Sequence, residues 1–228
     1  MTDFKFAPDG YPFIFGSLFL TLLASLLLLW SWRSTGINLA SFMLLGVTST
    51  LFLITMFMAF FFRDPERIAP TGEGLFVSPA DGKVILIREL FEPEFLMNES
   101  IEMSIFMSPL DVHVNRAPCD GVVSVVRYFP GRFMAAYKDE ASIKNENIVM
   151  ILACEKYKVM VRQVAGFLAR RAVCKAEIGD TLRRGERYGI IKFGSRLDVY
   201  MPVNTKIKVK VGDRVKAGET VIGGVDYE

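Results

Sequence analysis

The pair Gly194-Ser195, near the C-terminal end, is where the residue types of this chain point most clearly to chemistry. Most Gly-Ser pairs are turns, because Gly tolerates positive φ and Ser bonds to local backbone. This pair lies instead between two apolar runs, Gly189–Ile191 and Leu197–Met201. Between two strand-like segments a hydroxyl can be held rigidly against the preceding carbonyl, so Ser195 is a candidate nucleophile.

The chain contains one histidine, His113, in the strand-like segment Ser108–Arg116. Histidine is the side chain that titrates near neutral pH without perturbation, so His113 is the first candidate for acid–base work. A lone histidine is more often a structural residue, and that alternative stays open. Asp81, in the turn Ser78–Lys83, either orients a histidine or simply closes the turn.

Composition excludes several classes of function. The net charge is +2, which gives no electrostatic footprint for nucleic acid. Three cysteines without CxxC spacing, together with a single histidine, give no zinc pattern, and we expect no metal. An odd number of cysteines also argues against a disulfide framework, so we expect reduced thiols in a cytosolic compartment.

The elements that position these residues begin with a membrane segment, predicted over 1–62. Tyr11–Trp32 and Ser34–Phe62 carry no charged residue, and each is as long as the ~20 apolar residues that a spanning helix needs. The short break at Arg33–Gly36 predicts a tight antiparallel hairpin. A shallow re-entrant hairpin is the alternative. A cleaved signal peptide does not fit, because the first run lacks a basic n-region and a small-residue cleavage site.

Basic residues give the hairpin an orientation. Arg63 and Arg67 flank its exit, whereas its tip carries only Arg33. The positive-inside rule therefore places both ends in the cytoplasm.

Residues 63–228 have the texture of a β protein. After a linker marked by Pro65 and Pro70, short runs rich in Val and Ile alternate with turn residues. The predicted strands are Val84–Ile87, Ile101–Met107, Gly121–Tyr128, Ile148–Ala153, Val159–Val164, Tyr188–Phe193, Val199–Val203 and Lys206–Val211. This pattern predicts a mainly β, barrel- or sandwich-like domain. Ala165–Ala176 is the best helix candidate in this part of the chain, although its pattern is ambiguous.

One turn sequence occurs twice. Gly179–Glu186 and Gly212–Glu219, 33 residues apart, share the pattern Gly-Asp-x-x-x-x-Gly-Glu. Such units cap hairpins in biotinyl- or lipoyl-like sandwiches, and two copies favour a pseudo-symmetric pair of hairpins; chance similarity of turns is the alternative. The stretch Pro130–Lys138 is long for a hairpin link, which fits either a binding loop or a plain surface loop.

Six motifs, taken together and in order, resemble those of the short bacterial and archaeal phosphatidylserine decarboxylases. They are Phe61–Pro65, Ser78–Val84, Met107–Arg116, Pro130–Phe133, Asn145–Asn147 and Phe193–Ser195. The resemblance covers nearly everything from Phe61 to Val225, and the apolar hairpin fits a membrane-bound member.

The resemblance implies that the chain processes itself. Ser195 would attack the Gly194 carbonyl, and elimination from the resulting ester would separate a β chain, 1–194, from an α chain, 195–228, which together form a heterodimer. Ser195 would end as a covalent pyruvoyl group, which serves as the electron sink when CO2 leaves the substrate. His113 would act as base and proton donor, oriented by Asp81. The oligomeric state, a homodimer included, is left open.

The implied substrate is phosphatidylserine, converted to phosphatidylethanolamine at the cytoplasmic side of the cell (inner) membrane. Arg63, Arg67 and Arg132 would meet the lipid phosphate, since arginine forks suit phosphate oxygens; Arg63 and Arg67 are equally well explained as topology charges. Arg116 stands where larger members have a second histidine, which leaves the division of acid–base roles open.

Other functions remain as alternatives. A decarboxylase of archaetidylserine-type lipids would use the same head group. A non-catalytic membrane-anchored adaptor on a biotinyl-like sandwich lacks a Met-Lys-Met attachment lysine. A serine hydrolase using Ser195 and His113 lacks the Gly-x-Ser-x-Gly elbow.

Overall fold

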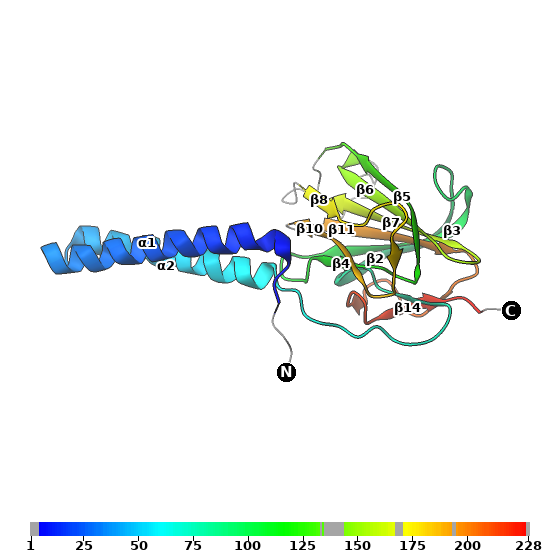
Figure 1. The fold of residues 1–228 in the computed structure, drawn as a ribbon, viewed down its shortest axis with the longest axis horizontal. Helices are drawn as coiled ribbons and strands as arrows, with labels where there is room; N and C mark the ends of the chain where they lie inside the picture. The colour runs from blue at the N-terminus through cyan, green and yellow to red at the C-terminus, as the bar shows by residue number, and fades with distance from the viewer. Residues whose placement is uncertain (1–4, 133, 135–143, 167–170, 193–194, 227–228) are drawn as a thin grey trace. The chain divides into compact units, whose positions relative to one another are not determined.

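The chain folds into two compact units, Met1–Glu66 and Arg67–Glu228, in a computed structural model (Figure 1). The structure describes residues 5–132, 134, 144–166, 171–192 and 195–226. Phe193, Gly194 and Phe133, which the sequence marks as motif residues, lie outside the described residues.

The first unit is a helical hairpin of α1 (Tyr11–Thr35) and α2 (Leu39–Phe61), preceded by the 3-10 turn Pro8–Gly10. Gly36 ends α1 with a positive φ of 70°, which glycine adopts without strain. Asn38 and Ser41 then start α2 with a capping box, in which each side chain accepts a hydrogen bond from the other's backbone N–H, at 3.0 and 2.8 Å. This pair of end signals confirms the turn that the sequence predicts between the two apolar runs.

Both helices carry large apolar side chains on their surface. Phe15, Phe19, Leu26 and Leu53 are each more than half exposed. At 25 and 23 residues, the helices are roughly 35 Å long, and the hydrocarbon core of a bilayer is about 30 Å thick. Length and composition are therefore sufficient for crossing a membrane, and the exposed apolar surface indicates membrane association.

The second unit is built from antiparallel strands in three sheets. The strands are β1 (Leu75–Val77), β2 (Gly82–Glu92), β3 (Asn98–Met107), β4 (Val114–Arg116), β5 (Gly121–Phe129), β6 (Asn147–Ala153), β7 (Lys158–Ala165), β8 (Arg171–Cys174), β9 (Thr181–Leu182), β10 (Arg187–Lys192), β11 (Ser195–Pro202), β12 (Lys206–Ile207), β13 (Arg214–Val215) and β14 (Val221–Gly224). The large sheet has the order β13-β2-β3-β11-β7-β6-β5-β9, and the small sheets are β1-β14-β12 and β4-β10-β8. The predicted mainly-β class, with an N-terminal helical hairpin, is confirmed.

The core lies between the large sheet and the two small ones. Strand β11 shows the alternation that produces it: Leu197 and Val199 enter the core, whereas Arg196 and Asp198 lie on the opposite face. Because β11 is paired with β3 on one side and β7 on the other, every residue from Ser195 to Tyr200 is held by two ladders.

Two sequence predictions in this unit are wrong. The helix expected over Ala165–Ala176 is absent from the described part of that range, where β8 pairs with β10 instead. Its apolar residues suit a helix as well as a buried strand, and tertiary pairing decides between them. The strand expected over Lys206–Val211 is limited to β12, Lys206–Ile207, whose pairing partner β14 is itself only four residues long.

The repeated turn is a repeated structure. Gly179–Glu186 and Gly212–Glu219 each begin with a glycine of positive φ, 99° and 101°. The first two residues of each copy exchange backbone hydrogen bonds of 2.8 to 2.9 Å with one valine, Val123 in the first copy and Val84 in the second. The two copies place β9 and β13 at opposite edges of the large sheet, as a pseudo-symmetric pair of hairpins requires.

A second repeat, x-Pro-x-Asp-Gly, completes this pseudo-symmetry. Ser78–Gly82 leads into β2, and Ala117–Gly121 leads into β5. The two turns bond to each other reciprocally: Arg116 N–H donates to the Pro79 carbonyl at 3.0 Å, and Val77 N–H donates to the Pro118 carbonyl at 2.9 Å. Asp81, a candidate site residue, thus sits in one of two equivalent turns that are bonded to each other.

Candidate active site

Ser195 is the first residue of β11, in register with Met107 on β3 and Ala165 on β7. Its side chain is fully buried, and its hydroxyl donates to the sulfur of Met107 at 3.3 Å. Sulfur is a weak acceptor, so this bond to the described part of the chain restrains the hydroxyl only weakly. The candidate nucleophile therefore stands at the first residue of a strand inside the large sheet, between β3 and β7.

His113 is fully buried directly before β4. A tight turn leads to it from Met107, closed by hydrogen bonds between Ser108 and Asp111 at 2.8 and 3.0 Å. The carbonyl of His113 accepts the N–H of Ile191 at 3.3 Å, and β4 continues alongside β10. Met107, which pairs with Ser195, is six residues before His113, and Ile191, which bonds to His113, is four residues before Ser195. The histidine is therefore connected to the neighbourhood of the serine through two short segments. Its action as a base stays a prediction.

Asp81 forms a buried ion pair with Arg67. The guanidinium meets both carboxylate oxygens, with Nη2 to Oδ2 at 2.8 Å, and the two side chains are only 6% and 12% exposed. The Ala217 N–H also donates to Oδ1 at 2.8 Å. A bidentate arginine fork fixes the plane and position of the carboxylate. The sequence analysis expected Asp81 to orient His113 and Arg67 to bind the lipid phosphate. In the structure Asp81 and Arg67 instead pair with each other. Both expected roles stay predictions.

The other two predicted arginines lie in different surroundings. Arg63, in the helical unit, donates to the Phe60 carbonyl at 2.7 Å and stacks 3.9 Å from the Phe60 ring. Arg132 is exposed, and its backbone bridges to the segment at Asn145. Most of the Pro130–Lys138 loop lies outside the described residues. Contact of either arginine with a lipid stays a prediction.

A buried charge cluster next to Ser195 was missed by the sequence analysis. Arg196, 1% exposed, donates from Nε to Asp198 at 2.5 Å and from Nη2 to the Ser104 hydroxyl at 2.8 Å. Glu102, also 1% exposed, lies 3.6 Å from the same guanidinium and accepts from Tyr200 at 2.9 Å. Burial lowers the pKa of Arg196, but Asp198 and Glu102 raise it more, so the guanidinium stays charged. The sequence carries one signal for this cluster, because Arg196 and Asp198 alternate with apolar residues along the strand.

Buried side-chain amides form a second set that the sequence did not reveal. Gln163 on β7 donates to Asn115 on β4 at 2.8 Å, and so joins the large sheet to a small one inside the core. Asn145 donates to the carbonyl of Ala165, the residue paired with Ser195, at 2.7 Å. These bonds fix the strands around Ser195 from two sides. Asn145 belongs to a motif that carried the family resemblance, but its contact is visible only in the fold.

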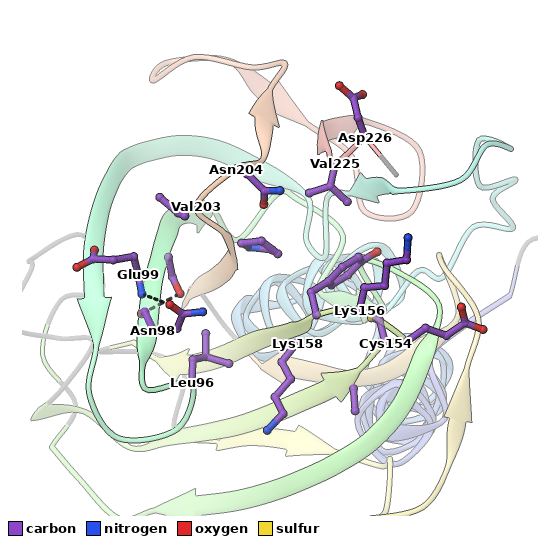
Figure 2. A pocket seen from close by; sticks show the side chains of 15 residues that line it. Leu96, Asn98, Glu99, Cys154, Lys156, Lys158, Val203, Asn204, Val225 and Asp226 are labelled. Atoms are coloured by element: carbon purple, nitrogen blue, oxygen red, sulfur yellow. Dashed lines mark hydrogen bonds between the residues drawn. The ribbon is translucent and has the colours of Figure 1, made fainter. Parts of the chain in front are cut away.

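A cavity lies at the far end of β11 from Ser195. This cavity, of about 600 Å³, is lined by Pro202, Val203 and the β6–β7 turn, and its side chains are drawn in Figure 2. A second cavity, of about 360 Å³, is lined by Phe129 and Pro130, which lie at the start of the segment that contains Arg132. Its wall also carries Glu102 of the buried charge cluster.

Comparisons with known proteins agree on one family. The family model described as phosphatidylserine decarboxylase matches residues 54–223. A phosphatidylserine decarboxylase proenzyme of Syntrophus aciditrophicus is 46% identical over 222 residues, covering 97% of this chain and 98% of its own. Proteins of the same name are 45% identical in Geobacter sp. strain M21, covering 97% of both chains, and 39% identical in Amoebophilus asiaticus, covering 96% of both. The chain belongs to the phosphatidylserine decarboxylase family.

Proposed function

We propose that the chain decarboxylates phosphatidylserine to phosphatidylethanolamine and CO2, using a pyruvoyl group made from its own Ser195. The observation that carries the proposal is the setting of Ser195: a fully buried hydroxyl at the first residue of a strand paired on both sides. Family membership supplies the reaction, and the printed name of the relatives, proenzyme, fits a chain that must be processed.

Self-cleavage begins when the Ser195 hydroxyl attacks the carbonyl carbon of Gly194. The peptide C–N bond breaks and an ester forms; loss of the Cα proton then expels the carboxylate of Gly194, and hydrolysis releases ammonia. His113 is the proposed base for these proton transfers, because it is buried on the segment beside β10 that leads to Ser195. Asp81, fixed by Arg67, is proposed to support that segment through the reciprocal turns that bond Pro79 to Arg116.

The strands around Ser195 fit the retention of a pyruvoyl group after cleavage. Residues 195–228 contain β11 to β14, and β11 pairs with β3 and β7, both of which lie in residues 1–194. The cut end would stay between Met107 and Ala165, and the two pieces would remain a heterodimer. When present, the group supplies an electron sink for decarboxylation. His113 would then deliver a proton to the substrate carbon.

The phosphate of the lipid is proposed to meet Arg132 or Arg63, since arginine forks suit phosphate oxygens. The guanidinium of Arg67 already forms a bidentate pair with Asp81, which favours a supporting role for Arg67 over direct binding. The helical hairpin would hold the enzyme at the cytoplasmic face of the cell membrane, where a two-tailed lipid can react without leaving the bilayer. Ester- and ether-linked serine lipids present the same head group, so both are proposed as chemically competent.

A denaturing gel of the full chain tests the proposal. The wild type should separate into a large N-terminal and a small C-terminal piece, Ser195→Ala should stay intact, and the control Ser124→Ala, on β5, should still split. The intact mass of the small piece should show an end without an amine. Purified protein incubated with each serine lipid should release CO2. An uncut wild-type chain that still carries its serine would overturn the mechanism and favour the adaptor or the hydrolase.

A further inference from the structure

Two of the three cysteines meet inside the β unit. The sulfur atoms of Cys119 and Cys154 are 3.5 Å apart, although the residues are 35 positions apart in sequence. Cys119 lies in the turn that leads into β5, and Cys154 begins the turn between β6 and β7. Neither belongs to the residues proposed for catalysis, and both precede Gly194, so they stay in one chain whether or not cleavage occurs.

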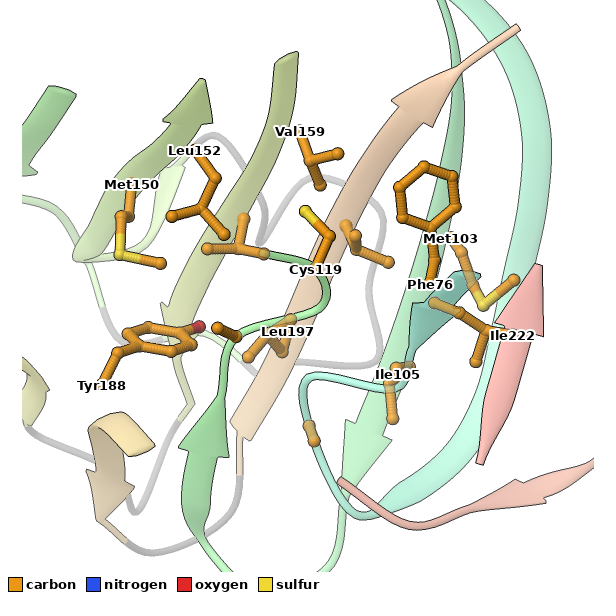
Figure 3. Packing of buried hydrophobic residues seen from close by; sticks show 14 of the residues in the cluster. Phe76, Met103, Ile105, Cys119, Met150, Leu152, Val159, Tyr188, Leu197 and Ile222 are labelled. Atoms are coloured by element: carbon orange, nitrogen blue, oxygen red, sulfur yellow. The ribbon is translucent and has the colours of Figure 1, made fainter. Parts of the chain in front are cut away.

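The two thiols differ in access. Cys119 is 2% exposed and packs among core residues such as Leu152 and Val159, as Figure 3 shows. Cys154 is partly exposed and lines the cavity drawn in Figure 2 as well as a second cavity of about 580 Å³. Cys119 lines the cavity of about 580 Å³ but not the one drawn in Figure 2, and at 2% exposed it is less accessible than Cys154. A small solute can therefore reach the sulfur of Cys154 more readily.

Electrostatics favour the same order of reaction. The hydrogen bond from Cys119 lowers the pKa of the Cys154 thiol, against the opposing effects of burial and Asp120. The same contact and burial raise the pKa of Cys119 well above its usual value. Because the thiolate is the nucleophile, Cys154 is the thiol that reacts first with an electrophile.

The packing of the turn does not require a thiol at position 119. The equivalent turn Ser78–Gly82 has Ala80 at the matching position, and Ala80 is fully buried. Glycine at the last position of the Cys119 turn gives Cys154 its room, since a Cβ on Gly121 would lie 3.3 Å from the Cys154 sulfur. An alanine at 119 should therefore leave the turn intact.

We propose that Cys119 and Cys154 form an oxidation site that a peroxide converts to a disulfide. The Cys154 thiolate attacks one peroxide oxygen; an S–O bond forms, the O–O bond breaks, and hydroxide leaves to become water. The resulting sulfenic acid is attacked by the sulfur of Cys119; an S–S bond forms, the S–O bond breaks, and a second water is released with the Cys119 proton. Two electrons pass from the two sulfurs to the peroxide.

The geometry requires only a local movement. A disulfide has an S–S length of about 2.05 Å, so the sulfurs must approach by roughly 1.5 Å, within reach of small side-chain rotations. The bond would join the start of β5 to the β6–β7 turn and close a loop that contains β5, Arg132 and β6.

Mass spectrometry of the full-length protein tests the proposal. Reduced protein is treated with a small excess of hydrogen peroxide, the remaining thiols are alkylated, and the large chain is digested without reduction. We expect a loss of about 2 Da and a peptide cross-link between Cys119 and Cys154, reversed by dithiothreitol. Oxidation should also raise the melting temperature by several degrees, because the cross-link constrains the unfolded chain.

The third cysteine provides the matched control. Cys174→Ser should form the cross-link as the wild type does, whereas Cys119→Ala should leave Cys154 to proceed to the sulfinic acid, a gain of about 32 Da. Cys154→Ser should leave Cys119 unmodified. Oxidation of wild-type Cys154 to sulfinic acid without a cross-link, or prior oxidation of Cys174, would overturn the proposal. All readouts are independent of decarboxylation, so failure here leaves the proposed function untouched.

Discussion

At the scale of single residues, Asp81 and Asp120 occupy equivalent positions in two copies of one turn, but their partners differ. Both accept a backbone N–H, from Ala217 at 2.8 Å and from Arg184 at 2.9 Å. Only Asp81 also forms a buried pair with Arg67, whereas Asp120 is exposed. The backbone N–H bond is therefore common to both turns, whereas the ion pair with Arg67 is specific to Asp81.

Asp81→Asn should therefore destabilise the protein far more than Asp120→Asn. The first change leaves the buried charge of Arg67 uncompensated, which costs about 3 to 5 kcal/mol; the second keeps an amide oxygen as acceptor and should cost below about 1 kcal/mol. Thermal unfolding of the full chain in detergent measures both. If Asp81 acts through Arg67, Arg67→Met should slow self-cleavage as Asp81→Asn does. Equal costs for the two aspartates would contradict this account.

Arg196 is the second residue whose burial makes a sharp prediction. Arg196→Met removes the cation that Asp198 and Glu102 share, and breaking a buried pair costs about 3 to 5 kcal/mol. Arg88 contacts the same Glu102 at 2.6 Å but is 53% exposed, so Arg88→Met should cost below about 1 kcal/mol. The fraction of cleaved chain on a gel adds a readout beside unfolding: because Arg196 fixes the start of β11, cleavage should fall only in its variant. Similar effects of both changes would show that the cluster does not depend on burial.

At the scale of elements, the two glycines that end the x-Pro-x-Asp-Gly turns differ in strain. Gly82 has a φ of 153°, and a Cβ there would lie 2.1 Å from the Phe106 carbonyl oxygen. At Gly121 the nearest atom would be 3.0 Å away. Gly82→Ala should thus shift β2 away from β3 and cost roughly 3 kcal/mol or more, well above the ~1 kcal/mol expected for Gly121→Ala. Amide hydrogen exchange along β2 and β3 would locate the damage, and an unchanged β2 in Gly82→Ala would refute the strain.

The sequence predicted the elements whose signal is local. The long strands alternate over enough residues to identify themselves, as Ile101–Met107 within β3 does, and Gly-Asp turns mark both sheet edges. The segment Ala165–Ala176 was misread, because a buried strand and a helix segment share the same apolar composition. The ion-pair partners of Arg67 and Arg196 depend on which segments lie side by side in the fold. The spacing of residues along the sequence does not predict those neighbours.

At the scale of the whole molecule, the β unit contains two copies of the same pair of turns, and only one half carries the candidate residues His113 and Asn115. Each half supplies a turn of the x-Pro-x-Asp-Gly kind and a Gly-Asp hairpin, and the halves meet where Gly185 and Gly218 would be 3.4 to 3.7 Å from each other's added Cβ. His113 and Asn115 stand in only one half, on the segment beside β10. The repeated turns thus form a shared frame, and the candidate site residues His113 and Asn115 depart from the symmetry. The same logic identified Cys119, whose counterpart is Ala80.

The residues placed around Ser195 all belong to the unit Arg67–Glu228, which has its own core. A chain that begins at Arg67 should therefore still cleave itself, provided that Arg67 remains to pair with Asp81. Without the apolar hairpin it should lose the high local concentration of membrane lipid, so turnover of phosphatidylserine in vesicles should fall roughly tenfold or more. Turnover of a short-chain serine lipid dispersed in detergent should stay within about threefold, because the reacting groups are unchanged. Gel analysis and CO2 release, run on the full chain and the truncated chain in parallel, measure both effects. Failure of the truncated but folded chain to cleave would mean that the helical hairpin contributes to the reaction centre itself.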